Sequence, residues 1–275
     1  MANATGSEPS RAPALPRQRA KAELVAGIDW ICHVLWLVRR REPEVLQFQT
    51  ERGTTGYPHY ILSRAGMLPD SEWVETLYVL PPGLVDHLRQ RCLALEPPTY
   101  LRAALAVGGS ALGRISPQPP SPALLELSRG AATEGRLPSA WAALPASGDP
   151  HQDWLQAAMV LREGRAFAHY RAASEQGLRP VELLHLSALW HGFDPLQVQR
   201  LFRWSEEDVA QARESLRARG WLDPTGGLTG EGRSQRDAIE ARTDRWTEDL
   251  LSGCTDAELE RLAREVSAGQ PGENS

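Results

Sequence analysis

The chain has 275 residues, enough for one large domain or two ordinary ones, and its 41% hydrophobic and 24% charged residues exclude a fully disordered protein. The longest apolar run, Trp30 to Val38, is far shorter than the roughly 20 residues of a membrane span. A formal charge of -5 provides no global attraction to nucleic acid, so any affinity for DNA has to come from a local patch.

The sequence carries no signal for export, for a metal or for a cofactor. Its N-terminal residues lack the apolar core of a secretory signal, which predicts a cytoplasmic protein. Cys32, Cys92 and Cys254 stand far apart without a CxxC pair, and the histidines show no HExxH spacing, so neither a metal site nor a disulfide framework is expected. No GxSxG elbow or phosphate-binding glycine loop is present, and no catalytic residue is assigned.

The N-terminal part predicts a tail followed by a helical domain. Residues 1–20 lack periodicity and contain three prolines, which is the composition of a disordered segment. Residues 22–41 predict an amphipathic helix, because apolar residues recur there at spacings of three and four. These apolar residues are Leu24, Ile28, Ile31, Leu35 and Val38. With the shorter helical patterns that follow, the predicted N-terminal helical domain covers residues 21–113.

Residues 114–150 predict a linker with one helix. A proline-rich break between Pro117 and Pro122 interrupts the pattern, and a helix is expected at about 121–135. The segment 136–150 has the composition of an irregular connection. The linker leads into a second run of helices.

From Pro150 onward, most helix boundaries carry a start or stop signal. The expected helices cover about 151–172, 179–190, 194–203, 206–219, 230–251 and 255–267. Ser205 is an expected N-cap, Thr255 with Glu258 a capping box, and Gly220 a C-cap glycine. A minimal two-stranded hairpin is expected over residues 221–229. These elements predict a winged-helix domain at 151–252, then a C-terminal helix and tail at 253–275.

The chain also resembles itself when it is displaced by 124 residues. The identical pairs are Glu51 with Glu175, Gly53 with Gly177, Leu62 with Leu186, Ser63 with Ser187, Asp70 with Asp194, Val74 with Val198, Leu77 with Leu201, Val85 with Val209 and Arg89 with Arg213. Tyr78 aligns with Phe202. Two explanations stay open: a duplication that puts a helix-turn-helix in each half, or a coincidence between amphipathic patterns. A duplication predicts that helices at about 57–67, 70–79 and 82–94 match those at about 181–191, 194–203 and 206–218.

The segment from Leu216 to Arg245 resembles the end of a MarR-type domain. There a helix closes on arginine, glycine and an apolar residue, a wing follows, and Leu-Thr with Gly-Arg opens the last helix. More specifically, the chain resembles the actinobacterial SalK-type helix-turn-helix family, small proteins often associated with antibiotic clusters. The residues that carry this resemblance are Gly135 to Pro138, Asp149 to His151, Trp154, Gln156, Ala157, Leu161 to Glu163, Arg165 and His169, and more loosely Gly56 to Tyr60, Arg64, Ala65, Leu77, Tyr78 and Pro82.

The resemblance spans most of residues 30–250 and implies DNA binding by analogy of fold. One stretch departs from the family pattern, which is rich in His, Gly and Asp after Leu-Arg-Glu. Here the chain reads Gly-Arg-Ala-Phe-Ala-His over residues 164–169, so a polar site in that stretch has lost two members.

The predicted reading helix gives mixed signals for DNA. Its basic residues Arg213, Arg217 and Arg219 are the candidate DNA contacts, but they lie toward the C-terminal end, where arginine also complements the helix dipole. The helix begins with three carboxylates, Glu206 to Asp208, and the predicted wing contains no Lys or Arg. Residues 151–250 contain 13 arginines against 16 acidic residues, so this half is not a basic domain.

A second candidate site lies on the helix that starts at His151. Four side chains fall on one face of it at helical spacing: Trp154, Arg162, Arg165 and His169. Facing the N-terminal half near His59, Tyr60 and Arg64, this face could clamp an anionic or aromatic small molecule. The alternative is structural: the arginines pair with Glu163, Asp153 or carboxylates of the other half, and the histidine caps a packed interface. The opposite side of the helix, with Leu155, Met159 and Phe167, is expected to anchor in the C-terminal core.

The expected fold is mostly α, with two helical halves. The C-terminal half is a winged helix-turn-helix with a minimal β-hairpin wing, and the N-terminal half is a degenerate repeat of it if the duplication is real. The function predicted first is a MarR-like transcriptional regulator or small-molecule-responsive factor. The alternative is a winged-helix scaffold without DNA readout, an enzyme or ligand-binding protein of specialised metabolism with its site between the halves. The expected partners are a small molecule, duplex DNA and a second copy of the chain, with no membrane.

Overall fold

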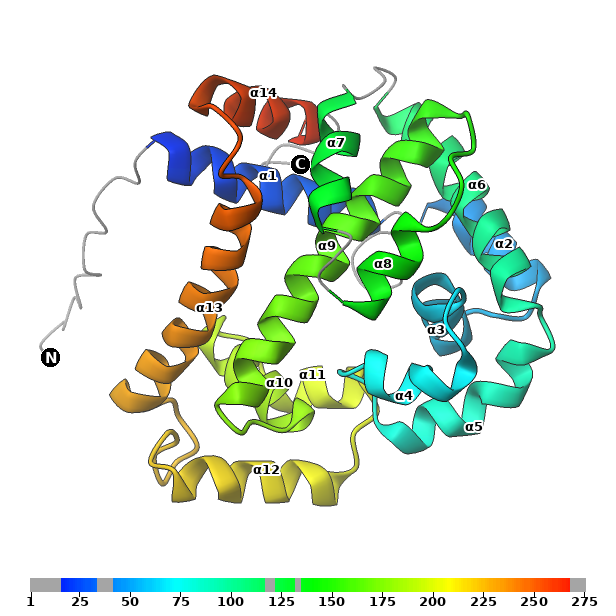
Figure 1. Cartoon of the computed structure of the whole chain (residues 1–275). Helices are drawn as coiled ribbons and strands as arrows, with labels where there is room; N and C mark the ends of the chain where they lie inside the picture. Colours follow the sequence, from blue (N-terminus) through cyan, green and yellow to red (C-terminus); the bar gives the residue numbers. More distant parts are fainter. Residues whose placement is uncertain (1–15, 34–41, 117–121, 132–134, 268–275) are drawn as a thin grey trace, which may run out of the picture.

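A computed structural model of the chain describes residues 16–33, 42–116, 122–131 and 135–267. Within these ranges the protein is built from helices and contains no strand (Figure 1). The helices of the first part are α1 (Pro16–Cys32), α2 (Pro43–Glu51), α3 (Tyr57–Ala65), the 3-10 helix Asp70–Glu72, α4 (Trp73–Thr76), α5 (Pro82–Leu93), α6 (Pro97–Ile115), α7 (Pro122–Ala131) and α8 (Arg136–Ala142). Those of the second part are α9 (Pro150–Glu175), α10 (Pro180–Trp190), α11 (Pro195–Leu201), α12 (Glu206–Ala218), α13 (Gly230–Leu250) and α14 (Asp256–Ser267).

Local sequence signals explain most of the helix starts. Proline stands in the first turn of several helices, where its missing N–H costs no hydrogen bond. The side chain of Asp149 caps α9 by accepting from the N–H groups of His151 and Gln152. Ser205 caps α12 by accepting from the N–H of Asp208 at 3.1 Å. The expected cap at Ser205 is thereby confirmed.

Helix α9 is the central element of the molecule. It runs through the middle of the bundle, with α6, α7 and α8 on one side and α13 on the other (Figure 1). Its residues Leu155 and Met159 are fully buried in one continuous apolar core that extends from α1 to α14. This core is shared, since it includes residues of both predicted domains, whereas the buried apolar residues of α10, α12 and α13 form two further clusters. The expectation that Leu155 and Met159 anchor in the C-terminal core is wrong, because both belong to the shared core and not to these clusters.

The first and last described helices close the structure together. In Figure 1, α1 and α14 lie side by side at the same end of the bundle, although they are far apart in the sequence. A Cβ atom on Gly27 would lie only 2.3 Å from Val266, so the two helices touch where glycine has no side chain. Lys21 Nζ also lies 2.8 Å from Glu248 on α13. The C-terminal helix is thus part of the shared core.

Several boundaries differ from the sequence predictions. Residues 16–20 belong to α1 and are not a disordered tail, whereas residues 1–15 and 34–41 lie outside the described residues. The stripe predicted at 22–41 is confirmed for its first three members, which are buried, and Leu35 and Val38 lie outside the described residues. The segment 136–150, expected to be irregular, begins with helix α8, because Leu137 and Trp141 bury their side chains against the core.

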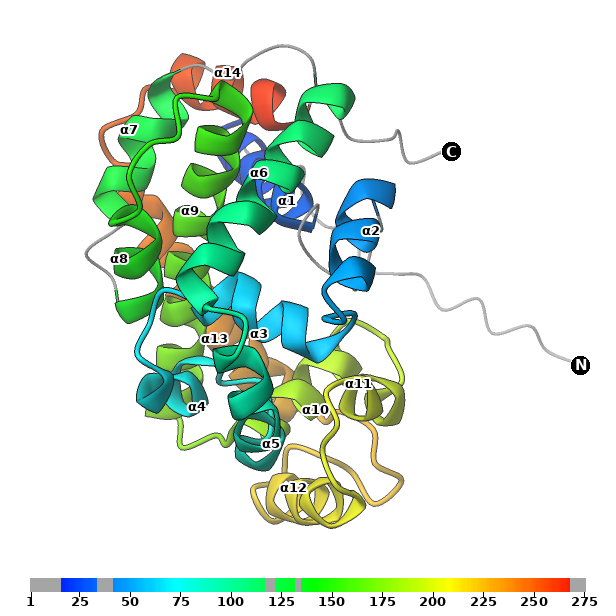
Figure 2. The same ribbon diagram turned by 90° about the vertical axis from the view of Figure 1, so that its right-hand side faces the viewer.

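The second half contains the expected helix order around a very short turn. Helices α10, α11 and α12 follow one another, and α12 packs on α10 at the edge of the molecule (Figure 2). Between α12 and α13, Leu222 and Leu228 form a single antiparallel bridge in place of two strands. Gly220 has a φ of 73° and the capping box of Thr255 with Glu258 is formed, which confirms both signals. The wing itself stays a prediction.

Candidate functional site

A cavity of about 920 Å3, open to solvent, lies between the helices of the bundle. Its walls come mainly from α1, α9, α10 and α13, with contributions from α3 and from the segment after α4. Four of the residues singled out in the sequence line it: Tyr60, Arg162, Arg165 and His169. The structure thus brings together these four side chains, which come from α3 and α9.

The guanidinium of Arg162 is held between two carboxylates. Its Nε lies 3.1 Å from Oδ1 of Asp29 on α1, and its Nη1 lies 3.3 Å from Oε1 of Glu163. Burial opposes its charge, but Glu163 and Asp29 outweigh this and raise the pKa of Arg162 above its ordinary value. Asp153, considered as a partner from the sequence, instead accepts hydrogen bonds from Ser147 near the start of α9.

Arg165 occupies the cavity wall one turn further along α9. Its Nη2 lies 3.3 Å from Glu240 and 3.5 Å from Asp244, both on α13. Its Nε is buried and has no hydrogen-bond partner among the described residues. A buried N–H donor without a partner is costly, so an acceptor that reaches this atom from the cavity would remove that cost.

His169 belongs to the same polar network. Its Nδ1 lies 3.2 Å from the hydroxyl of Thr243 and 3.7 Å from Glu240, while Arg236 approaches Glu240 to 2.6 Å. Burial and the charge of Arg236 lower the pKa of His169 to about 4. Burial would raise the pKa of Glu240, but Arg236 and His169 bring it below its ordinary value. At neutral pH the wall therefore presents a neutral imidazole beside an ionised carboxylate and two guanidinium groups.

Aromatic side chains form another part of the wall. Tyr60, Tyr170 and Phe202 line the cavity, and Tyr170 stacks on Tyr78 with 4.7 Å between the ring centroids. Burial raises the pKa of Tyr170 to about 12, so its hydroxyl stays protonated. The arrangement offers flat apolar surfaces next to cationic donors, which suits a planar or anionic molecule.

Three predicted site residues lie away from the cavity wall. Arg64 is 2% exposed and makes a bidentate ion pair with Glu163, its Nε lying 3.0 Å from Oε1. His59 is fully buried, with its Nδ1 2.7 Å from the hydroxyl of Tyr100. Trp154 is 1% exposed and packs in the shared core. These side chains have almost no exposed surface, so a ligand in the cavity does not reach them, and we assign them a structural role.

Phe167 departs from its expected place in another way. It is 39% exposed and lies against Gly135, so it does not anchor α9 in the core. With 3.6 residues per turn, Phe167 lies about 120° around α9 from Leu155, so helical periodicity does not place it on the buried side of the helix. The expectation of an anchored Phe167 is wrong for this reason.

The candidate DNA contacts lie on or just after α12. Arg217 and Arg219 are exposed and Arg213 is half-buried. The guanidinium of Arg219 donates to the carbonyl oxygens of Gln176 and Gly177 at 3.0 and 2.7 Å, so it fastens the end of α9. Glu206 and Glu207 are exposed in the first turn. The surface of α12 combines arginine with a larger number of carboxylates.

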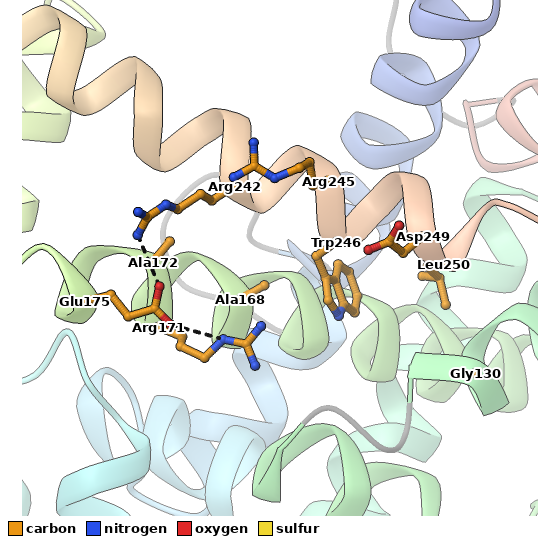
Figure 3. A pocket seen from close by; sticks show the side chains of 10 residues that line it. All are labelled: Gly130, Ala168, Arg171, Ala172, Glu175, Arg242, Arg245, Trp246, Asp249 and Leu250. Atoms are coloured by element: carbon orange, nitrogen blue, oxygen red, sulfur yellow. Dashed lines mark hydrogen bonds and ion pairs between the residues drawn. The ribbon is translucent and has the colours of Figure 1, made fainter.

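A second hollow of about 690 Å3 lies between α9 and α13 (Figure 3). Arg171 and Arg242 both pair there with Glu175, at 3.9 and 3.1 Å. Figure 3 shows the indole of Trp246 between the two helices, and this side chain also borders the larger cavity. The arginines of this groove and the acidic partners Asp29 and Glu240 were missed in the sequence. Only the spacing of Arg236 and Glu240, four residues apart on one helix, signals a pair.

The described helices include none that is long and apolar enough to cross a membrane. A family model described as a helix-turn-helix family matches residues 35–269, which include both halves of the chain and the cavity walls from α3 to α13. No curated protein and no solved structure matches the chain.

Proposed function

Because the chain belongs to the helix-turn-helix family, we propose that it is a small-molecule-responsive, MarR-like DNA-binding regulator. The observation that carries this proposal is the place of the cavity: α9, α10 and α13 wall it, α12 packs on α10, and Leu216 of α12 shares an apolar cluster with residues of all three helices. A molecule in the cavity therefore touches the same helices that position the helix-turn-helix. Ligand binding and DNA binding become coupled if the ligand favours one arrangement of these helices.

The polar contacts between α10 and α13 supply the route for this coupling. Arg236 on α13 donates from Nε to the hydroxyl of Ser187 on α10 at 3.1 Å, and both residues line the cavity. Further along α10, His185 lies 3.0 Å from Gln199 of α11. A ligand that forms a hydrogen bond with Arg236 or Ser187 competes with the bond between them and changes the contact between α10 and α13. Helix α12 packs on α10 and moves with it.

The expected ligand is an anionic or aromatic small molecule. Arg162 and Arg165 provide charged donors, and Tyr60 and Tyr170 provide flat walls. Both guanidinium groups already have carboxylate partners, so a ligand anion would share these groups with the carboxylates. It would also accept a hydrogen bond from Nε of Arg165, which has no partner among the described residues. A neutral aromatic molecule would instead fill the apolar part of the cavity.

The turn at residues 221–229 takes the place of the wing in this proposal. Its bridge between Leu222 and Leu228 is short, and Asp223 closes it by accepting from the N–H of Gly227 at 2.9 Å. Hydrogen bonds from the hydroxyl of Thr225 and from the N–H of Gly227 hold the pKa of Asp223 below its ordinary value. The turn contains no cation for a minor groove, so we assign it a structural role.

The test is a mobility-shift assay with duplexes from the regions that flank the gene, at low and at moderate salt. The proposal predicts a shift whose affinity falls steeply between about 50 and 200 mM salt, because bound phosphates release counterions. Mass spectrometry of the natively purified protein is expected to show a retained small molecule, and extracts containing it should change the shift. A protein that shifts no duplex at low salt contradicts the regulator.

The alternative is a ligand-binding scaffold without DNA readout. The acidic start of α12 favours it, since Glu206, Glu207 and Asp208 repel phosphate where a reading helix approaches DNA. A retained small molecule together with no DNA shift is the result that supports this alternative.

A further inference from the structure

We propose that helices α2 to α6 form a second helix-turn-helix unit, and that α5, rather than α12, is the helix that contacts duplex DNA. The inference rests on the proposed DNA-binding function and changes which surface of the protein contacts the DNA. It moves the contact from Arg213, Arg217 and Arg219 to the other half of the chain, where Tyr60 of α3 and Val79, just before α5, line the same cavity and provide the coupling to a ligand.

The helix bounds of the two halves correspond at the same displacement as the sequence. Adding 124 to the bounds of α3, Tyr57–Ala65, gives 181–189, within α10. The same displacement takes α4, Trp73–Thr76, into α11, and α5, Pro82–Leu93, onto 206–217, which is nearly all of α12. An amphipathic coincidence accounts for matching apolar residues, but it does not require three helices and their connections to keep the same lengths.

The backbone repeats a special conformation at the start of each unit. Gly53 and Gly177 both have positive φ angles, 62° and 69°. The N–H of Gly53 donates to Thr50 and that of Thr54 to Gln49, at 3.1 and 2.8 Å. In the second half the equivalent donors, Gly177 and Leu178, make the equivalent bonds to Ser174 and Ala173, at 2.8 and 3.1 Å. Both units thus begin with the same helix C-terminal cap.

An arginine ties the end of the third helix back to this cap in both units. Arg91 of α5 donates to the carbonyl oxygen of Gly53, and Arg219, just after α12, donates to that of Gly177. The two arginines are not at equivalent positions, yet they bind equivalent carbonyl groups. Each therefore ties the end of its third helix to the cap of the first helix of its unit, α2 or α9.

The surrounding helices pack in the same order. In the first half, α6 packs on α2 and α3, and in the second half, α13 packs on α9 and α10. The main difference is the connection to the last helix of each unit. Residues 221–229 form a turn between α12 and α13, whereas only Ala94–Glu96 connect α5 to α6. The first unit is a helix-turn-helix without a wing.

The two units face one end of the molecule. Both views place α5 and α12 at the same end, away from α1 and α14 (Figures 1 and 2). The units also contact each other reciprocally: Tyr78 donates to the carbonyl of Leu178, and Trp204 donates to that of Val79, both at 3.1 Å. A duplex bound at this end can contact α5 or α12, and the charge of each helix decides which of them can approach the phosphates.

Charge separates the two candidate helices. Helix α5 contains one carboxylate, Asp86, and two arginines, whereas α12 contains four carboxylates and two arginines. At equivalent exposed positions, Gly83 and Gln90 of α5 stand where α12 has Glu207 and Glu214. Exposed His87 adds another polar group that can bond to a base edge. Phosphate repulsion therefore acts on α12 and is absent from most of α5.

The experiment compares matched substitutions on the two helices in the full chain. Gln90→Glu on α5 and Gln211→Glu on α12 each add one negative charge to an exposed side chain without changing its size. Gly83→Glu adds a second test on α5, since nothing lies within 4 Å of the position of its Cβ. Binding is measured by fluorescence anisotropy on the duplex that the wild-type protein shifts, and circular dichroism checks that each variant is folded.

We expect Gln90→Glu and Gly83→Glu to weaken binding about tenfold or more, and Gln211→Glu and Arg213→Ala to change it less than about twofold. Equal losses on both helices, or a loss confined to α12, would overturn the inference while leaving the regulator standing. Variants of α5 that bind like the wild-type protein would overturn it as well. Failure of the proposed function is distinct from these results, because then the wild-type protein itself shifts no duplex.

Discussion

Two arginine–carboxylate clusters at α9 have the same residue types but lie in different surroundings, one in the core and one on the cavity wall. Arg64 and Glu163 form a pair whose side chains are both 1% exposed, enclosed by the core. Arg165 and Glu240 form a pair whose side chains are 29% and 24% exposed, on the wall of a cavity. The closed pair is completed by protein groups, Arg162 and the hydroxyl of Tyr60, whereas the open pair keeps a donor atom unsatisfied. Access to solvent, more than residue type, distinguishes a structural ion pair, or brace, from a binding site.

The strongest way to break this comparison is to remove the carboxylate of the closed pair. Glu163→Ala leaves Arg64 buried without its counter-charge, and we expect it to lower the free energy of unfolding by about 3–5 kcal/mol in urea titrations. Glu175→Ala is the matched control, because its side chain is 56% exposed, and it should cost less than about 1 kcal/mol. Similar losses for both variants would mean that the buried pair is not a brace.

The open pair should be less sensitive to the same change. Glu240→Ala removes a carboxylate that three neighbours share, but water can reach the cavity wall, so we expect a loss of about 1–3 kcal/mol in the same titration. The ordering of the two variants is the test. A loss for Glu240→Ala larger than that for Glu163→Ala would reverse the roles assigned to the two clusters.

A third prediction uses pH. Burial holds the pKa of His169 at about 4 in the folded protein, below its ordinary value near 6.5. Between these values the unfolded chain binds more protons, so the free energy of unfolding should fall as the pH falls from about 6.5 to about 4. His169→Gln should flatten this part of the profile, measured as the difference from the wild-type protein. Parallel profiles would show that His169 does not titrate as a buried neutral base.

His185 serves as a comparison within the same measurement. Burial also lowers its pKa to about 4, although it lies near α12 and away from the cavity wall. His185→Gln should therefore flatten the same pH range. A ligand in the cavity is expected to alter the contribution of His169 and to leave that of His185 unchanged, because His169 lines the cavity and His185 does not.

The sequence predicts the second half of the fold well for a physical reason. Its helices are bounded by local signals such as the cap at Ser205 and the glycine at 220, which act within one turn. Helix α8 was missed because its helicity comes from burial of Trp141 against distant residues. Packing of that kind leaves no local signal.

The candidate site is predictable only in part. Periodicity places Arg162, Arg165 and His169 on one face of α9, and the cavity lies against that face. It does not indicate which carboxylates oppose them: Asp29 is 133 residues from Arg162, and Glu240 is 75 residues from Arg165. Nor does it separate buried Trp154 from the exposed part of the stripe, because periodicity says nothing about which neighbouring helix covers each turn.

Mass spectrometry of the natively purified protein tests the central claim, a small molecule held at the open arginine cluster, most directly. The account predicts a retained ligand in the wild-type protein and in Arg171→Ala, whose arginine borders only the outer groove. It predicts loss of that ligand in Arg165→Ala with little change in stability. A folded wild-type protein that retains no ligand, or an Arg165→Ala variant that retains it like Arg171→Ala, would contradict the claim.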